Sequence, residues 1–342
     1  MFHYVWPRLF IITLYFSVTS CLLSSSRWDS LSMKQITSLL EKGASTEDLA
    51  ELSRRNLSFE ITSNHCTLVR DYVDLVAAVA SRIPEEYQRP IVDLKIYFGP
   101  KHLVSHKNTI GILGGMGPLS DANLIELIVS QMLSSGMEGK NIGMLHLLSL
   151  PPPRTTIDQI SGGPSYALRL TSFLRQDYAS FFLASNTAHV YFESLQFIAG
   201  SKRIVNLPLS VANQIANHPQ LSNEPVLILG TMKAWDYHLY EELFNHEGVS
   251  FKTLSVQDQA RIQEWIDRIK TSKLEKHHSH MLYQEILLLA RKYGTLNILL
   301  GCTELPLGLS DYAGNLYREG FLLFDTEKIF AEYIAKALRE TK

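Results

Sequence analysis

The residue best suited to chemistry in this sequence is Cys302, in the stretch Gly301-Cys302-Thr303-Glu304. An apolar run at residues 297–300 precedes it, and the residues that follow suit the first turn of a helix. A thiol between the carboxyl end of a strand and the start of a helix lies where ligands bind in parallel sheets. The helix dipole there favours the thiolate, which is the reactive form. A buried structural cysteine is the alternative, so a catalytic role needs support from elsewhere in the chain.

A second segment, residues 181–187, repeats the pattern around the cysteine. Each segment has an apolar strand, a small residue, a nucleophile-type side chain (Ser185 or Cys302) and then a hydroxyl or amide group at a helix start. If the two segments face each other across a cleft, these two side chains lie on opposite faces of one small substrate. That arrangement allows proton removal on one face and proton return on the other.

Two loops that follow strands are suited to binding an anion. Residues 114–118, Gly-Gly-Met-Gly-Pro, follow an apolar strand at 109–113, and glycines there let backbone amides approach an anion closely. The spacing is not that of a dinucleotide fingerprint, and the next strand, 141–148, ends without the acidic residue that a ribose needs. Arg154 follows three prolines, in a stiff loop where it either clamps a carboxylate through two hydrogen bonds or lies exposed.

The composition limits the classes of function. The chain has 342 residues, of which 46% are hydrophobic and 19% charged, so it can bury a sizeable core in about two domains. The net charge of −2 gives no reason to expect nucleic acid as a partner. Three scattered cysteines suit neither a disulfide framework nor a zinc site. We interpret the histidine cluster at 277–280 as a solvated helix start and predict no metal site.

Strands alternate with helices from residue 108 onward, which predicts an α/β fold of parallel sheets with helical crossovers. We expect strands in the first half at 109–113, 141–148, 180–184 and 203–206. We expect strands in the second half at 225–229, 249–254, 296–300 and 321–326, with helices at 233–245, 257–270 and 276–292. The segment 30–82 has helical spacing and 90–105 suits a linker or an extra strand, so residues 26–107 are predicted to form a helical N-terminal extension.

The first 25 residues are predicted to be a signal peptide or an apolar N-terminal helix. Residues 9–23 form an apolar stretch after Arg8, short for a membrane span of about 20 residues but typical of a signal-peptide core. The segment ending at Cys21 also resembles a bacterial lipoprotein cleavage site, and a true start at Met33 is a further alternative. We favour an exported, periplasmic or membrane-anchored protein over a cytoplasmic one, with membrane contact only if the N-terminus is retained or lipidated.

Three motifs in order, at residues 114–118, 185–189 and 301–306, together resemble the aspartate/glutamate racemase superfamily. The Met and Pro of the glycine loop resemble the aspartate racemase branch. The resemblance implies two pseudo-symmetric domains with parallel four-stranded sheets flanked by helices, and an active site in the cleft between them. It places domain 1 at 108–210 plus 323–342 and domain 2 at 211–322. It also implies that no cofactor is needed, and a homodimer is one expectation because family members often form dimers.

The resemblance further implies roles for single residues. In the family, two cysteines flank the substrate Cα; one removes the α-proton as a thiolate and the other donates a proton to the opposite face. Cys302 matches the second cysteine, and Ser185 stands in place of the first. Arg154 and Lys270 match the cations for the side-chain carboxylate. The remaining substrate-binding matches are Met116, Asn186, Thr187, Thr231 and Thr303, and the supporting residues are His189 and Glu304.

Ser185 leaves the reaction open. A free thiol titrates at about pH 8.5 and its pKa can be lowered, whereas a serine needs a partner to act as a base. His189, one helical turn on, is either that partner or structural, and Ser185 is alternatively a helix N-cap. We predict an isomerase that acts on aspartate or glutamate by Cα proton transfer and is one-sided because of Ser185. The alternatives are a single-cysteine decarboxylase or elimination enzyme on a related acid, and an inactive relative that binds a dicarboxylate or a protein partner.

Overall fold

The structure is a computed structural model that describes Trp28 and residues 31–62, 65–83, 89–135, 143–151, 168–221, 224–270 and 276–340. The predicted signal peptide at residues 1–25, with Cys21, lies outside these residues, and so does Arg154. Within the described ranges, no helix has both the length and the apolar character needed to cross a bilayer.

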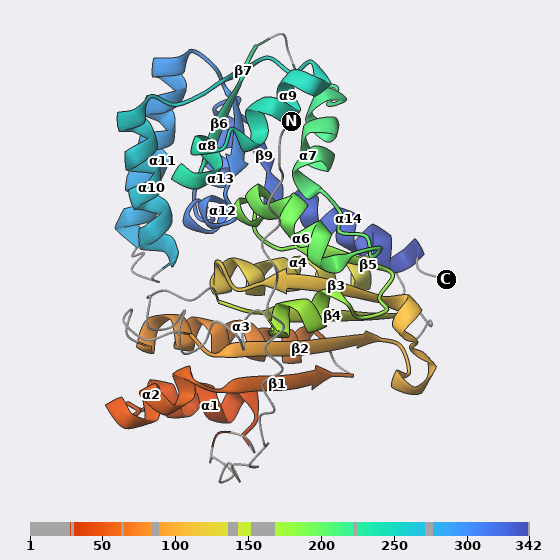
Figure 1. The fold of residues 1–342 in the computed structure, drawn as a ribbon. Helices are drawn as coiled ribbons and strands as arrows, with labels where there is room; N and C mark the ends of the chain where they lie inside the picture. Colours follow the sequence, from red (N-terminus) through yellow and green to blue (C-terminus); the bar gives the residue numbers. More distant parts are fainter. Residues whose placement is uncertain are drawn as a thin grey trace, which may run out of the picture.

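Two sheets flanked by helices make up the molecule (Figure 1). The first sheet has the strand order β1-β2-β4-β3-β5 and the second β7-β6-β8-β9. The strands of the first sheet are β1 (Asn56–Ile61), β2 (Ile91–Phe98), β3 (Thr109–Gly114), β4 (Gly143–Ser149) and β5 (Ser180–Leu183). Those of the second are β6 (Val226–Gly230), β7 (Phe251–Lys252), β8 (Asn297–Gly301) and β9 (Leu322–Asp325), all paired in parallel. The predicted α/β architecture is confirmed.

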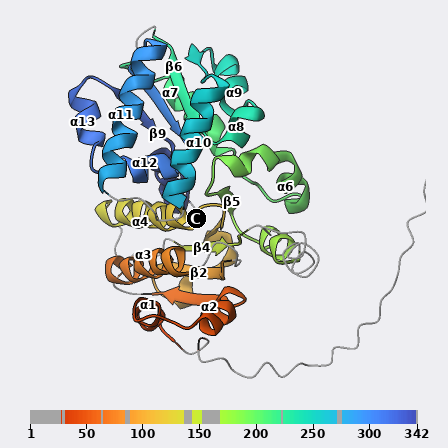
Figure 2. The same ribbon diagram turned by 90° about the vertical axis from the view of Figure 1, so that its left-hand side faces the viewer.

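The helices lie mostly along the faces of the two sheets. Residues 323–325, which we assigned to domain 1, lie in β9 of the second sheet, whereas α14 packs against α4 and α7 beside the first. Figure 2 shows α1, α3 and α4 in a row alongside the first sheet. The helices are α1 (Met33–Glu41), α2 (Thr46–Ser53), α3 (His65–Arg82), η1 (Lys101–Leu103), η2 (His106–Asn108), α4 (Pro118–Ser134), η3 (Thr187–Tyr191), α6 (Phe192–Ala199), α7 (Leu207–Ala216), α8 (Met232–Asp236), α9 (Leu239–Glu247), α10 (Val256–Lys270), α11 (Lys276–Tyr293), α12 (Glu304–Gly308), α13 (Ala313–Arg318) and α14 (Thr326–Glu340).

The N-terminal extension contains the predicted helices and also two strands. β1 pairs in parallel with β2, and β2 pairs antiparallel with β4, so the first sheet has five strands instead of four and is not wholly parallel. The strand β1 escaped prediction because its buried side chains, Leu57 and Ile61, are four residues apart, a spacing that also fits a helix. One continuous apolar core runs from α1 and α3 through the first sheet to α4 and α14, so the extension is part of the first domain's core.

Three predicted elements differ from the structure. The helix expected at 233–245 is divided into α8 and α9, because His238 has a left-handed backbone conformation (φ 51°) that a continuous helix excludes. The strand expected at 203–206 is reduced to a single bridge between Phe181 and Ile204. The strand expected at 249–254 is shortened to β7.

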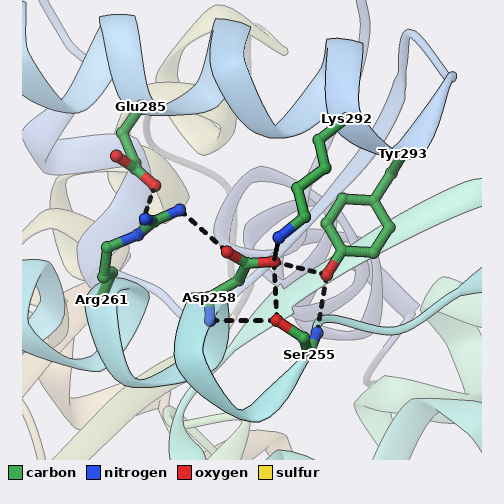
Figure 3. A network of polar contacts seen from close by, with 6 residues as sticks. All are labelled: Ser255, Asp258, Arg261, Glu285, Lys292 and Tyr293. Carbon is green, nitrogen blue, oxygen red and sulfur yellow. Dashed lines mark hydrogen bonds and ion pairs between the residues drawn. The ribbon is translucent and has the colours of Figure 1, made fainter.

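A polar network around Asp258 joins α10 to α11 (Figure 3). Burial by itself would raise the pKa of Asp258, but hydrogen bonds, chiefly from Lys292, Tyr293 and Ser255, outweigh it and bring the pKa to about 2. The network therefore fixes the direction of α10, whose last residue is Lys270. The donors to the carboxylate are Ser255 Oγ (2.8 Å), Arg261 Nη2 (2.8 Å), Lys292 Nζ (2.6 Å) and Tyr293 OH (2.6 Å).

The variant Asp258→Asn is expected to lower the free energy of unfolding at pH 7 by about 2 kcal/mol, because several donors lose a charged acceptor. The wild-type contribution is complete above about pH 4, where the unfolded carboxyl is ionised, and disappears as the pH falls through about 2. Urea unfolding at pH 7 and pH 3 measures both effects, and the difference in stability between wild type and variant should fall to about half at pH 3. Glu264→Gln, on an exposed part of the same helix, is the control; equal stability of Asp258→Asn and wild type at pH 7 would contradict this role.

Candidate active site

Cys302 lies directly after β8 and two residues before α12, as predicted. Its side chain is buried, and Sγ donates a hydrogen bond to Glu304 Oε2 at 2.9 Å. Burial raises the pKa of Cys302 well above its usual value and the charge of Glu304 adds to the rise, while the charge of Lys270 opposes it. The backbone N–H of Glu304 at the start of α12 does lower the pKa of the thiol, in the direction expected of a helix start, but burial outweighs this effect. At rest Cys302 is a thiol whose S–H group is hydrogen-bonded to the carboxyl group of Glu304.

Glu304 links this thiol to the glycine loop of the first sheet. Glu304 Oε1 accepts a hydrogen bond from Ser120 Oγ at 3.4 Å. Gly117 lies against the same oxygen: a Cβ at this position would come within 2.0 Å of Oε1, so only glycine permits the approach. The glycine loop is thus shaped to admit a side chain from the second half of the chain. Gly115 has a different role, because its φ of +110° and its contact with the Leu150 backbone require glycine in the turn itself.

Lys270, at the end of α10, contributes a positive charge to the same place. Burial would lower the pKa of Lys270, but the negative charge of Glu304, and that of Cys302 when it is ionised, outweigh it and the pKa lies above its usual value. The structure therefore brings Lys270, Cys302 and Glu304 within electrostatic range of one another. Whether Arg154 joins Lys270 stays a prediction.

Hydrogen bonds between the two halves join the predicted substrate-binding residues. Thr187 Oγ1 and Thr231 Oγ1 are 2.9 Å apart. Asn186 Oδ1 accepts a hydrogen bond from the Tyr240 hydroxyl, and Asn186 Nδ2 donates to Thr326 Oγ1 at 2.9 Å. These two contacts fix which way the Asn186 amide faces. The loop after β5 is thereby held against the loops of the second sheet, as the repeated strand-end pattern led us to expect.

The other predicted residues lie nearby. Thr303 is buried, with Oγ1 3.4 Å from Glu304 Oε2. Met116, in the glycine loop, is half-buried and packs on the apolar cluster beside β5.

Ser185 is half-buried at the end of β5, and His189 does not activate it. His189 Nδ1 is 3.0 Å from the backbone carbonyl oxygen of Ser185, so the neutral imidazole donates its proton there and not to the hydroxyl. Burial lowers the pKa of His189 to about 4. The N-cap interpretation of Ser185 is wrong as well, because the N-cap position of η3 belongs to Asn186. His189 is therefore structural, and among the residues that the structure describes no base forms a hydrogen bond with the Ser185 hydroxyl.

Three residues at this place were missed in the sequence: Tyr240, Thr326 and Asp121. Asp121 Oδ2 accepts hydrogen bonds from Gly115 N at 2.6 Å and from Ser149 Oγ at 3.0 Å, and burial raises its pKa to about 7. Asp121 has a sequence signal, since an acidic residue just after Pro118 suits a helix N-terminus. Tyr240 and Thr326 have none, because their partners are far away in the chain. The part of the chain that the structure describes holds no group of three or more His, Cys, Asp or Glu side chains fit to bind a metal ion.

Comparisons with known proteins agree with the geometry. The family model described as Asp/Glu/Hydantoin racemase matches residues 113–334. A crystal structure of an aspartate racemase homologue from Pyrococcus horikoshii OT3 superposes with a TM-score of 0.51 at 20% identity, covering 68% of this chain and 100% of that one. The aspartate racemase of Picrophilus torridus gives 0.50 at 18% identity, covering 67% of this chain and 94% of that one. At such identities the likeness shows the fold. No curated protein sequence matches the chain.

The buried His189 predicts a dependence of stability on pH. Its pKa is about 4 in the folded protein and about 6.5 in the unfolded chain, so the unfolded state binds more protons between these values. The wild type should therefore lose up to about 3 kcal/mol of stability relative to His189→Asn as the pH falls from 7 to 4. Urea titrations along this range measure the difference. The exposed His102→Asn should behave as wild type, and parallel curves for wild type and His189→Asn would show that His189 is not buried as a neutral ring.

Proposed function

We propose, on the premise that this chain belongs to the Asp/Glu/Hydantoin racemase family, that it moves the Cα proton of aspartate or glutamate without a cofactor. Cys302 would remove and return this proton. The observation that carries the proposal is the buried hydrogen bond from Cys302 Sγ to Glu304 Oε2, with the charge of Lys270 in range. A structural cysteine needs neither a buried acceptor nor a cation. The cation also favours an acidic substrate over an apolar one.

The reaction would begin with the thiol. Glu304 accepts the S–H proton, and the resulting thiolate of Cys302 takes the proton from the substrate Cα. The electron pair of the broken C–H bond spreads into the α-carboxylate of the substrate. The ammonium group of Lys270 stabilises this added negative charge, because the site is buried and the positive charge is already in place before the reaction begins. Return of the proton from Cys302 restores the starting enantiomer, and exchange of that proton with solvent labels Cα.

Proton delivery to the opposite face would depend on Ser185. A serine hydroxyl is a far weaker acid than a thiol, and His189 is occupied with the carbonyl of Ser185. We therefore infer a one-sided site, which exchanges the α-proton of one enantiomer faster than it converts that enantiomer into the other. Asn186 and Thr187, held by contacts with the second half, would bind the α-carboxylate and amino group.

A second candidate function is decarboxylation of a related acid, and one observation favours it. The raised pKa of Cys302 makes the thiol the resting form, which suits a proton donor. In this reaction a C–C bond breaks, CO₂ leaves, the electron pair stays on Cα, and Cys302 protonates it. Release of CO₂ from a malonate-type diacid, absent in Cys302→Ala, would identify this activity.

The primary test is exchange at Cα in heavy water. L- and D-aspartate and L- and D-glutamate are each incubated with the protein, and the Hα signal is followed by proton NMR. We expect loss of Hα from one enantiomer of one acid well before its mirror image accumulates. Cys302→Ala should slow the exchange about a thousandfold, since it removes the group that takes the Cα proton, whereas Cys66→Ala, the thiol-matched control, should not. No exchange from any of the four, with folded protein, would rule out the racemase-like function.

A thiol in place of Ser185 should restore proton delivery to the second face of the substrate. In Ser185→Cys, conversion between enantiomers should rise about tenfold or more, because a thiol donates and accepts a proton far more readily than a hydroxyl. Chiral chromatography of the products measures it. Ser180→Cys, at the other end of β5, is the matched control. If Ser185→Cys racemises no faster than Ser180→Cys, Ser185 does not lie opposite Cys302.

A further inference from the structure

The N-terminal extension reaches the end of the first sheet where the candidate active site lies, which is formed by the carboxyl ends of β3, β4 and β5. Because β2 runs antiparallel to β4, the start of β2 lies beside the end of β4, with Val92 opposite Ser149. The carboxyl ends of β3 and β5 lie at the same edge, because both run parallel to one another and to β4. Arg89, which precedes β2, is therefore placed at this edge, and it is only 7% exposed.

Arg89 contacts the second half of the molecule at Lys270. Arg89 Nη2 donates a hydrogen bond to the backbone carbonyl oxygen of Lys270 at 3.5 Å, across 181 residues of sequence. Lys270 is the last residue of α10, where carbonyl groups lack partners within the helix and where a positive charge is favourable. In Figure 1 the lower end of α10 lies toward the first sheet and the extension. The guanidinium thus holds the helix end that carries the cation of the site.

Two other described arginines, Arg54 and Arg55, also precede a strand at this end of the first sheet. Arg55, whose carbonyl accepts a hydrogen bond from Ile91 N, pairs with Glu51 at 2.7 Å within the extension. Arg54 is exposed. Arg89 also lies outside the family match at residues 113–334, so this chain supplies the contact from a part that the family model does not include.

We propose that Arg89 is a positioning residue: by holding the C-terminal end of α10, it directs the charge of Lys270 into the site and makes the extension part of the apparatus that binds a diacid. The substrate class rests on the proposed function. The anchoring of α10 does not, so the two are tested separately.

The first readout is amide hydrogen exchange of the full chain by mass spectrometry. In Arg89→Met, the amides of residues 262–270 should exchange faster than in wild type, because the helix end has lost its anchor. Arg54→Met, an exposed arginine of the same extension, should leave them unchanged. If Arg89→Met does not fold, Arg89→Gln takes its place.

The second readout is kinetic, with the acid that exchanges best. Arg89→Met should raise KM about tenfold and also lower kcat by a few fold, because Lys270 both binds the diacid and stabilises the negative charge that develops on it. Arg89→Lys should recover most of the loss. The double variant Arg89→Met/Lys270→Met should bind no worse than Lys270→Met alone, since Arg89 acts through Lys270.

Unchanged amide exchange at the end of α10, or an unchanged KM, would overturn the proposal. If the wild type catalyses no Cα exchange, the proposed function fails by itself, and calorimetric binding of succinate replaces KM. Weaker succinate binding by Arg89→Met than by wild type and Arg54→Met then supports the positioning role. Equal binding by all three, or no binding by wild type, refutes it.

Discussion

The burial of one carboxyl group, Glu304, between the two halves of the molecule is the constraint on which the site depends. A buried charge is unfavourable unless hydrogen-bond donors and an opposite charge surround it. The thiol of Cys302, the hydroxyl of Ser120 and the cation of Lys270 meet this need from three different elements. Gly117 makes room by having no side chain. The glycine loop, the thiol and the end of α10 therefore form one electrostatic unit, and a change in any of them alters the other two.

The sequence was informative wherever chemistry and local structure coincide. The ends of β5 and β8 were predictable because an apolar run followed by a small residue and a polar side chain is a pattern within a few residues. Among the residues identified through such strand ends, Thr187 contacts Thr231, and Asn186 contacts Tyr240, whose ring lies close to Gly301 beside Cys302. Crossover connections place the carboxyl ends of the parallel strands together within each sheet, and hydrogen bonds between loops, such as that of Thr187 with Thr231, join the two sheets.

What could not be predicted depends on contacts between distant parts of the chain. Tyr240 lies within a helix and has no local feature that indicates its bond to Asn186. The pKa of Cys302 could not be foreseen either, since the local pattern shows a helix start but not the degree of burial, which here decides the direction of the shift. Arg89 precedes β2, which pairs antiparallel with β4. No nearby residue in the sequence indicates that Lys270 is the neighbour of Arg89.

The antiparallel pairing of β2 with β4 also covers an apolar strand that would otherwise form the edge of the first sheet. All seven residues of β4 are buried, and both of its neighbours in the sheet saturate its backbone groups. A chain that began at β3 would lack β1 and β2 and leave β4 as an apolar edge strand, which readily pairs with strands of other molecules and aggregates. In the present chain the open edge belongs instead to β1, whose side chains are mostly solvated. The extension thus also covers the apolar strand β4.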